Sequence, residues 1–278
     1  MFIDSVCGME IKNKKFHSSH DKRNYYFCST KCKLKFEKES VRSREKVVIE
    51  FYNVCKVYEL GNARITAVKG ANLEISKGEF LSIQGPSGSG KSTFLHLIGC
   101  LDLPTKGSIF LDRKDISMLS ESELAQIRGR KIGFVFQQFN LINTLNALEN
   151  VMLPMIFQGK VIEERRKRAV ELLDVVGLKD RMYHKPKELS GGQMQRVAIA
   201  RALANDPDVI LADEPTGNLD SSTGHSVMNV LVNLNKKFGK TIIVVTHDPY
   251  IAKYAKRKVN ILDGQIAHDH QFMKRFIW

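Results

Sequence analysis

An eight-residue run, Gly85–Ser92, has the spacing G-x-x-x-x-G-K-S, which suits the binding of phosphate groups. A strand-like stretch, residues 79–84, precedes the run, and a stretch with apolar residues at helical spacing, residues 91–100, follows it. Glycines let backbone N–H groups surround a β-phosphate, and the helix N-terminus adds a favourable dipole. We expect Lys91 to bridge the β- and γ-phosphates and the Ser92 hydroxyl to bind Mg²⁺. The residues expected to bind a nucleotide here are Gly85, Pro86, Ser87, Gly88, Ser89, Gly90, Lys91, Ser92 and Thr93.

A second apolar stretch, Val209–Ala212, ends in two adjacent carboxylates, Asp213 and Glu214. Beside a phosphate loop, Asp213 is suited to hold the Mg²⁺ shell, and Glu214 is suited to orient and deprotonate an attacking water. These roles need one carboxylate against the metal and one free, which adjacent residues at a strand end provide. The alternative interpretation is a strand with a solvated acidic tip.

The segment Ser190-Gly191-Gly192-Gln193 is a second candidate phosphate cradle, because a serine and two glycines stand at a predicted helix start. The chain has only one phosphate loop, so two cradles are best explained if two chains face each other. Each chain of an isologous two-fold dimer would then lend this segment to the nucleotide of its partner. The alternative is an ordinary N-cap serine followed by a flexible turn.

These motifs resemble those of the ATP-binding-cassette (ABC) ATPases, and the resemblance extends over about residues 47–267. It implies that the chain hydrolyses ATP with Mg²⁺. It also implies that Gln137 contacts Mg²⁺ and the water near the docking site of a membrane partner, and that Asp220 lies in a loop across the dimer interface. His247 is implied to contact the γ-phosphate, and Tyr58 to stack on adenine. The implied catalytic residues are Glu214, His247, Lys91 and Gln137, and the implied Mg²⁺ ligands are Ser92, Gln137 and Asp213.

Two of these roles have plain structural alternatives. Tyr58 stands 27 residues before Gly85, but stacking needs only a ring, so an ordinary core or surface aromatic remains an alternative. For His247 the alternative is a satisfied histidine at a strand end.

Three segments resemble the lipoprotein-releasing and macrolide-exporter group of this family: Gly133–Ile142, Ala147–Val151 and Ala212–Ser221. The resemblance implies a homodimer that drives a separate integral-membrane permease. No apolar run reaches the ~18 residues of a membrane span, and residues 1–15 lack an apolar secretion signal. We therefore expect a peripheral protein at the cytoplasmic face of the cell membrane.

Three of the five cysteines, Cys7, Cys28 and Cys32, fall near the N-terminus. In a reducing cytoplasm such a cluster favours a metal site over a disulfide framework. The spacing resembles that of the small heavy-metal-binding modules called YHS or TRASH domains, and three thiolates suit Cu⁺ or Zn²⁺. The fourth ligand is left open between His17 and His20. The alternative is a small domain with three buried, unliganded cysteines.

Strands that alternate with helices predict an α/β fold with a mainly parallel sheet. Together with the resemblance, they imply a P-loop NTPase (RecA-like) core with an antiparallel β subdomain, an inserted helical subdomain at about residues 141–190, and a small cysteine-rich N-terminal domain. The expected boundaries are residues 1–40 for the metal-binding domain, 41–46 for a linker and 47–278 for the ATPase domain. Strands are predicted at Val47–Tyr52, Leu73–Ile75, Glu79–Gln84, Ser108–Leu111, Lys131–Phe136, Val209–Ala212 and Thr241–Thr246. Helices are predicted at Lys91–Cys100, Ala147–Phe157, Ile162–Val176 and Gln193–Ala204.

The formal net charge of +13 is densest near the N-terminus, where residues 1–46 carry 12 Lys/Arg and 6 Asp/Glu. Such a surplus suits an anionic lipid surface, an acidic partner or nucleic acid, or is a solvated basic face. The chain has no aromatic-interleaved base-reading motif, so we expect no nucleic-acid partner. The leading hypothesis is an exporter ATPase, with heavy-metal (copper) efflux as a candidate role. The alternatives are an ABC-type ATPase acting on nucleic acid or ribosomes, and a metal-responsive regulatory ATPase.

Overall fold

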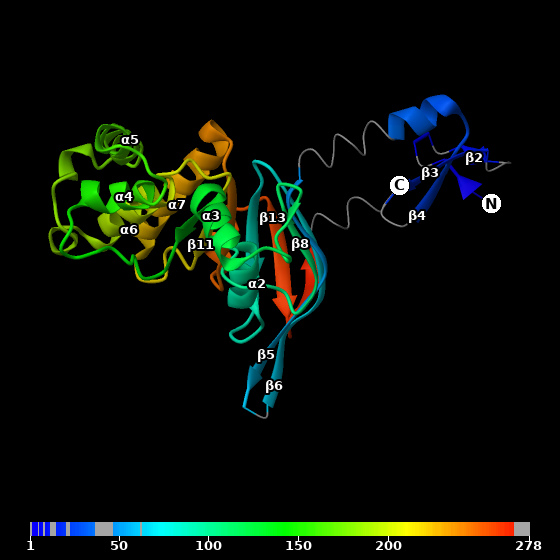
Figure 1. Ribbon diagram of the computed structural model, residues 1–278, viewed down its shortest axis with the longest axis horizontal. Coiled ribbons are helices and arrows are strands. Elements are labelled where there is room, and N and C mark those ends of the chain that lie inside the picture. The colour runs from blue at the N-terminus through cyan, green and yellow to red at the C-terminus, as the bar shows by residue number, and fades with distance from the viewer. Residues whose placement is uncertain are drawn as a thin grey trace. The chain divides into compact units, whose positions relative to one another are not determined.

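The computed structural model describes residues 2–4, 6–7, 9–11, 15–20, 23–36, 47–61 and 63–269. The chain divides into two compact units, Met1–Val47 and Val48–Trp278 (Figure 1). The predicted linker at residues 41–46 lies outside the described residues. Among the described residues, no helix combines the length and the hydropathy that a membrane span requires.

The described residues of the smaller unit form two antiparallel strand pairs and one short helix. Its strands are β1 (Phe2–Ile3), β2 (Glu10–Ile11), β3 (Phe16–His20) and β4 (Arg23–Phe27), with β1 paired to β2 and β3 to β4, and residues 30–36 are helical. Phe27 is fully buried, and its ring centroid lies 5.1 Å from that of Phe36. The Phe36 ring also lies 4.7 Å from that of Tyr25. A core of so few aromatic rings buries little apolar area, and units of this size commonly need a further staple such as a metal.

The larger unit is organised around a six-stranded sheet in the order β10-β11-β12-β7-β13-β14. The first five strands are parallel, and β14 pairs antiparallel with β13. Because β11, β12 and β7 are parallel neighbours, their carboxyl ends lie at one edge of the sheet, where ligands bind in open α/β folds. The strands are β7 (Phe80–Gln84), β10 (Ile132–Val135), β11 (Val209–Asp213), β12 (Thr241–Val245), β13 (Arg257–Leu262) and β14 (Gln265–Asp269).

A second, antiparallel sheet has the strand order β6-β5-β8-β9. Its strands are β5 (Val47–Leu60), β6 (Ala63–Ser76), β8 (Lys106–Leu111) and β9 (Lys114–Asp115). β5 and β6 are much longer than the predicted strands Val47–Tyr52 and Leu73–Ile75. The first half of β6 is largely exposed, so its sequence lacks the apolar alternation of a half-buried strand. In Figure 1 β5 and β6 run together as an arm that extends beyond the rest of this unit.

Helices cover the six-stranded sheet. They are α2 (Lys91–Ile98), α3 (Glu121–Lys131), α4 (Ala147–Ile156), α5 (Ile162–Val175), α6 (Gly191–Ala202), α7 (Ser221–Phe238) and α8 (Pro249–Ala252), with short 3-10 turns at η1 (Lys179–Arg181) and η2 (Pro186–Glu188). The sequence patterns do not predict α3, because only Leu124 is buried and apolar periodicity is absent. They also miss α7, whose Gly and Asn residues lower helix propensity, although it buries residues at helical spacing. These residues are Val227, Met228, Leu231 and Leu234.

Two apolar cores lie on opposite faces of the six-stranded sheet. One core joins Ile210 of β11 and Ile242 of β12 to residues of α4, α5, α6 and α7. The other joins Leu211 and Ile243, the next residues of the same strands, to α2 and the antiparallel sheet. Successive side chains of β11 and β12 thus enter opposite cores, which explains why both strands are continuous apolar runs. Burial on both faces holds the strand ends, and the residues that follow them, in place.

Candidate functional site

The loop Gly85–Ser92 connects β7 to α2 at the carboxyl edge of the sheet. A Cβ atom on Gly85 would lie 2.2 Å from the carbonyl oxygen of Ile261 in β13. Gly90 has a φ of 102°, and a Cβ atom there would lie 2.5 Å from the carbonyl oxygen of Ala67 in β6. Neither position accommodates a side chain, and the loop backbone is therefore held closely against β6 and β13.

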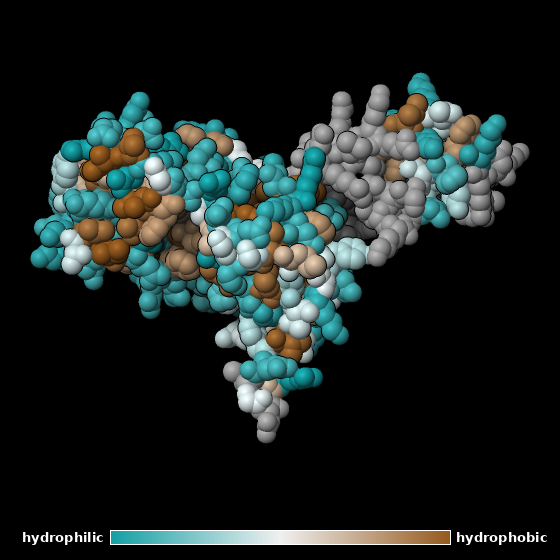
Figure 2. Space-filling model, in the orientation of Figure 1, coloured by the Kyte–Doolittle hydropathy of each residue, from teal (hydrophilic) through white to brown (hydrophobic). Residues whose placement is uncertain are grey.

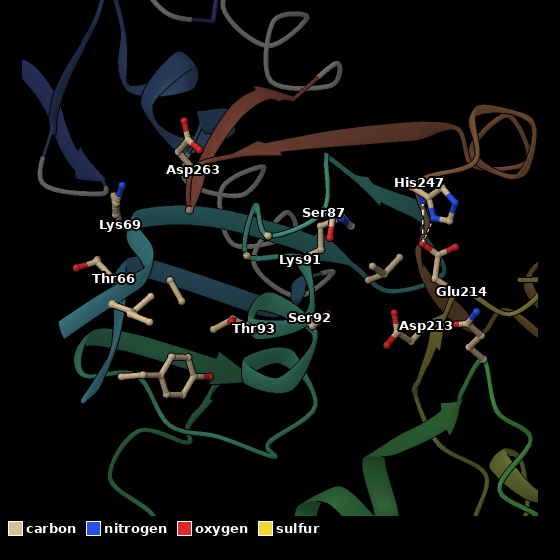
Figure 3. Close-up of a pocket in the computed structure, with 18 residues that line it drawn as sticks. Thr66, Lys69, Ser87, Lys91, Ser92, Thr93, Asp213, Glu214, His247 and Asp263 are labelled. Carbon is tan, nitrogen blue, oxygen red and sulfur yellow. Dashed lines mark hydrogen bonds and ion pairs between the residues drawn. The ribbon is translucent and has the colours of Figure 1, made fainter. Parts of the chain in front are cut away.

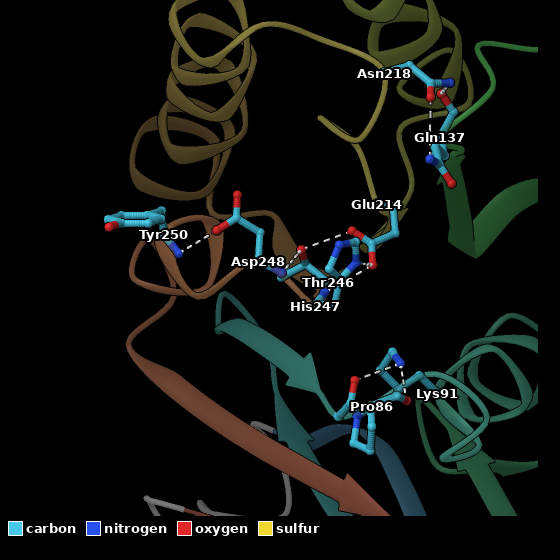
Figure 4. A network of polar contacts seen from close by, with 10 residues as sticks. Pro86, Lys91, Gln137, Glu214, Asn218, Thr246, His247, Asp248 and Tyr250 are labelled. Atoms are coloured by element: carbon cyan, nitrogen blue, oxygen red, sulfur yellow. Dashed lines mark hydrogen bonds and ion pairs between the residues drawn. The ribbon is translucent and has the colours of Figure 1, made fainter.

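The Lys91 side chain folds back over this loop. Its Nζ donates to the carbonyl oxygens of Gly85 and Pro86, each at 2.8 Å (Figure 4). The Ser89 side chain is buried, and its Oγ has no hydrogen-bond partner among the described residues. An ammonium group, a helix N-terminus and a buried hydroxyl at one concave loop fit the phosphates of a nucleotide.

A cavity of about 980 Å³ opens beside the loop and gathers residues from distant parts of the sequence (Figure 3). Its lining contains Ser87, Gly88, Gly90, Lys91, Ser92 and Thr93 together with Tyr58, Gln137, Asp213, Glu214 and His247. Residues that sequence reasoning did not name complete the wall, among them Ile65, Thr66, Ala67 and Lys69 of β6, Asp263 and Gly264. Gly85, Pro86 and Ser89 belong to the loop without lining the cavity. The volume is of the size that small-molecule ligands occupy in proteins.

Asp213 is the last residue of β11 and is half-buried. Burial, followed by the charge of neighbouring Glu214, raises the pKa of Asp213, and His96 and Lys91 oppose this rise. Such a carboxylate favours its ionised form when a cation binds beside it. Asp213 and Ser92 both line the cavity, and their oxygen atoms fit Mg²⁺, which prefers oxygen ligands.

Glu214 turns back toward the end of β12. Its φ of 43° is left-handed, and its N–H donates to the carbonyl oxygen of Val245 at 2.9 Å. Its Oε1 accepts a hydrogen bond from the backbone N–H of His247 at 3.0 Å and lies 2.6 Å from His247 Nδ1 (Figure 4). The Glu214 side chain is 17% exposed and that of His247 is 73% exposed. The structure thus shows a direct hydrogen bond between Glu214, the expected base, and His247, the residue expected to contact the γ-phosphate.

Thr246 is a further residue that contacts the Glu214 carboxylate, and the sequence motifs did not point to it. Its hydroxyl donates to Oε2 of Glu214 at 3.0 Å. The available signal was a hydroxyl residue directly before His247.

Tyr58, on β5, is anchored at the cavity wall. Its hydroxyl donates to Oδ2 of Asp102 at 2.8 Å, and Nζ of Lys56 lies 5.0 Å from the ring centroid. Burial, followed by the hydrogen bond to Asp102, raises the pKa of Tyr58. These contacts restrain the ring at a position where an adenine can stack on it.

Gln137 follows β10 and lines the cavity. Its Nε2 donates to Oδ1 of Asn218 at 3.4 Å, and Nδ2 of Asn218 donates to the carbonyl oxygen of Gln137 at 3.0 Å (Figure 4). Asp220 does not line the cavity; it caps α7 by accepting from the N–H of Thr223 at 3.0 Å. Hydrogen bonds from Thr223 and then Ser222 hold the pKa of Asp220 well below its usual range.

The segment Ser190-Gly191-Gly192-Gln193 begins α6 and does not line the cavity of its own chain. Ser190 Oγ accepts from the N–H of Gln193 at 3.3 Å, and Gln193 Oε1 accepts from the N–H of Ser190 at 2.9 Å, which is a capping box. The structure therefore shows the N-cap serine that sequence analysis gave as the alternative. Ser190 is also exposed, so capping and contact with a second chain are compatible.

The smaller unit contains four potential metal ligands whose ligand atoms lie within 4.8 Å of one another, namely Asp4, Cys7, Cys28 and Cys32. The sulfur atoms of Cys7 and Cys28 are 3.6 Å apart, and those of Cys28 and Cys32 are 3.8 Å apart. Of the two histidines considered as fourth ligand, His17 is exposed on β3 and is not part of this cluster, because the strand presents it to solvent. The side chain of His20 lies outside the described residues.

Asp4, which sequence reasoning did not single out, joins the two segments that carry the thiols. It is buried, and it accepts hydrogen bonds from the backbone N–H groups of Cys28 at 2.6 Å, Val6 at 2.7 Å and Cys7 at 3.1 Å. Burial alone would raise the pKa of Asp4, but these hydrogen bonds, that of Cys28 foremost, hold it well below its usual range. Its place three positions before Cys7 was the only sequence signal.

The parallel sheet, the phosphate loop between β7 and α2, and the carboxylates after β11 define the larger unit as a P-loop NTPase. The ABC transporter family matches residues 68–217, which is more than half of the chain. The chain belongs to the ATP-binding proteins of the ABC transporters. Its larger unit is an ABC ATPase, for which ATP and Mg²⁺ are implied.

Individual relatives agree with this assignment. An ABC transporter ATP-binding protein of Thermotoga maritima is 53% identical over 221 residues, which are 80% of this chain and 94% of the relative. The macrolide export ATP-binding/permease protein MacB of Wolinella succinogenes is 49% identical over 81% of this chain, but the matched part is 35% of MacB.

Solved structures show the same fold. The dimeric structure of MJ0796, an ABC transporter cassette from Methanocaldococcus jannaschii, has a TM-score of 0.73 at 54% identity and covers 80% of this chain and 97% of that chain. A dimeric post-hydrolysis state of MJ0796 bound to ADP and Pi has a TM-score of 0.73 at 53% identity, with the same coverage. The resemblance of the smaller unit to YHS or TRASH domains stays a prediction.

Proposed function

We propose that this chain is the ATP-hydrolysing subunit of an ABC exporter, that it acts as a homodimer at the cytoplasmic face of the cell membrane, and that it drives a separate permease. The observation that carries the proposal is the position of Ser190. The cavity gathers Tyr58, Lys91, Ser92 and most of the other expected nucleotide contacts of one chain, whereas Ser190 is exposed and outside it. A second copy related by a two-fold axis would supply the missing segment. The dimer of MJ0796 supports this arrangement, and the identity to the macrolide exporter MacB supports a role in export.

The charged and polar side chains expected to act on ATP have distinct chemical roles in this proposal. Lys91 and the loop N–H groups bind the β- and γ-phosphates, and Ser92, Asp213 and Gln137 would hold Mg²⁺, which neutralises developing phosphate charge. Glu214 accepts a proton from water while the water oxygen bonds to the γ-phosphorus and the bond to the bridging oxygen breaks, leaving ADP and phosphate. His247 contacts the γ-phosphate.

A second cavity, of about 720 Å³, supports the docking of a permease. It is lined by residues of α3, β10, α4 and α6 and includes Phe136, the residue before Gln137. Phe157 at its rim is 78% exposed, and Figure 2 shows further apolar surface over the helical part of this unit. An apolar groove that adjoins Gln137 offers a path by which a bound membrane protein senses the nucleotide site.

For the smaller unit we propose a heavy-metal site in which Cys7, Cys28 and Cys32 supply the thiolates. The donor set fits Cu⁺ or Zn²⁺, because both favour sulfur ligands. Both carboxylate oxygens of Asp4 already accept backbone hydrogen bonds, so Asp4 fits the role of an anchor for the ligand segments. Heavy-metal (copper) efflux or resistance is the role that such a module suggests for the exporter.

Mixing two inactive variants tests the shared site. Lys91→Ala removes the loop cation, and Ser190→Arg blocks the segment offered to the partner, so each variant alone should lose ATPase activity. A mixed dimer contains one site with Lys91 and Ser190 both intact, and ATPase activity should return on mixing. A mixture that stays as inactive as its components speaks for a site completed within one chain.

Copurification from detergent extracts separates the proposed function from its alternatives. A bound integral-membrane permease supports the exporter. Bound RNA or ribosomes would favour an ATPase that acts on nucleic acid, and a metal-dependent change in ATPase rate without a permease would favour a regulatory ATPase.

A further inference from the structure

The hydroxyl of Thr246 is held between two partners in the turn after β12. Thr246 is 1% exposed. Its Oγ accepts a hydrogen bond from the backbone N–H of Asp248 at 3.0 Å and lies 3.0 Å from Oε2 of Glu214. Its own backbone N–H donates to the carbonyl oxygen of Ile83 in β7, which fixes the residue at the end of the sheet.

The direction of the hydroxyl hydrogen follows from these contacts. A backbone N–H can only donate, so Asp248 uses an acceptor position of the Thr246 oxygen. The single hydroxyl hydrogen is then free to point at Glu214, whose carboxylate accepts it. The contact is therefore a hydrogen bond to an ionised group, which is stronger than one between neutral groups.

Thr246 and His247 bind different oxygens of the same carboxylate. His247 binds Oε1 through its backbone N–H and its ring, and Thr246 binds Oε2. A carboxylate held on one oxygen only can still rotate about its terminal torsion, which is broad for Glu. The second contact removes that freedom.

We propose that Thr246 is a positioning residue for ATP hydrolysis: its hydroxyl holds Oε2 of Glu214 and so sets the direction in which this carboxylate meets the attacking water. The inference rests on the proposed role of Glu214 as the base. Thr246 does not line the cavity, so we expect no contact between its side chain and the nucleotide. Its loss should therefore act on the rate of hydrolysis and leave nucleotide binding unchanged, since a small misplacement of a base costs rate.

β12, the strand that leads to Thr246, contains a matched control. Thr241, at the start of β12, is also 1% exposed, and its hydroxyl accepts from the N–H of Gly78 at 3.0 Å. Thr241→Val removes the same buried hydroxyl at the first residue of β12, the end remote from Glu214. A general effect of a buried Thr-to-Val change would appear in both variants.

Steady-state ATPase kinetics and thermal denaturation of the full chain compare Thr246→Val, Thr246→Ser, Thr241→Val and Glu214→Gln. We expect Thr246→Val to lower kcat at least about tenfold with an unchanged KM for ATP, because a hydrogen bond to a charged group is lost. Thr246→Ser keeps the hydroxyl and should keep kcat within about threefold of the unmodified chain. Thr241→Val should lower Tm without lowering kcat.

Three outcomes would overturn the inference: a wild-type kcat in Thr246→Val, a kcat in Thr246→Ser as low as that in Thr246→Val, or an equal loss of kcat in Thr241→Val. Glu214→Gln separates these from a failure of the proposed function. Near-normal turnover in Glu214→Gln would show that Glu214 is not the base, and the proposed function of this residue would fail. An inactive Glu214→Gln beside a fully active Thr246→Val would reject the role of Thr246 alone.

Discussion

Nδ1 of His247 lies 2.6 Å from Oε1 of Glu214, although 33 positions separate the two residues in the chain. The contact forms because β11 and β12 are parallel neighbours, so that the residues following them meet at one edge of the sheet. The largely shielded carboxylate and the exposed imidazole thus form a pair that connects the expected base with the exposed rim of the cavity.

Replacement of Glu214 by Gln should leave ATP binding intact and lower turnover by orders of magnitude, because an amide accepts no proton from water. The uncleaved nucleotide should then hold two chains together, so sedimentation with Mg²⁺-ATP should report a dimer. Glu164→Gln serves as the control, because it makes the same replacement of an acid by an amide at an exposed position of α5. It should behave like the unmodified chain. ATP turnover near the normal rate in Glu214→Gln would exclude Glu214 as the base.

The double variant Cys28→Ser, Cys32→Ser should lose bound metal while its basal ATPase activity stays normal, since the described residues that line the cavity beside the phosphate loop belong to the larger unit. Elemental analysis after equilibration with Cu⁺ or Zn²⁺ measures the stoichiometry. Cys55→Ser changes a half-buried cysteine of the larger unit and should retain the metal. Equal metal content in all three proteins would reject the site.

Asp4→Asn should weaken metal binding by roughly 10- to 100-fold, the usual effect of removing a group that orients ligands.

Asp4 also predicts that the stability of the smaller unit depends on pH. Its pKa in the fold lies well below the ordinary 3.8, so its contribution to stability is present above pH ~4 and is lost as the pH falls further. When the smaller unit is titrated with acid, the fluorescence of its tyrosines should report a loss of stability as the pH falls below about 4. In Asp4→Asn, stability should depend less on pH over the same range.

Arg257 binds two acids at the C-terminal edge of the larger unit. Its Nε and Nη2 contact Asp269 of β14 at 2.9 and 2.5 Å, and Nη1 lies 3.0 Å from Oε1 of Glu79. The Arg257 and Asp269 side chains are each 8% exposed. Arg257→Ala should therefore lower the free energy of unfolding by about 3–5 kcal/mol, because it removes the cation that faces two largely buried carboxylates.

The matched control for this loss is Arg64→Ala, which breaks the exposed pair of Arg64 and Glu59 and should change the free energy of unfolding by less than about 1 kcal/mol. Denaturant titrations measure both values. If both variants lose a similar free energy of unfolding, the burial of the Arg257 ion pairs does not add to stability.

The strand, glycine-rich loop and helix within residues 79–100 were predicted from local sequence, because the glycine spacing and the apolar patterns lie within one short segment. The strands β11 and β12 were also predicted close to their observed bounds, since burial on both faces makes them continuous apolar runs. The exposed half of β6 and the polar helix α3 were missed, because neither buries enough apolar residues to leave a periodic pattern.

The residue types of the site were determined by the sequence alone: a lysine and serine in a glycine-rich loop, two carboxylates after an apolar strand, and three clustered cysteines. Only the tertiary structure decided which of them meet. Strand order brings Glu214 to Thr246 and His247, and a buried carboxylate on Asp4 brings Cys7 to Cys28. The physical reason is that hydrogen bonds between distant segments depend on how strands pair and pack, and one sequence position contains no record of its neighbours in space.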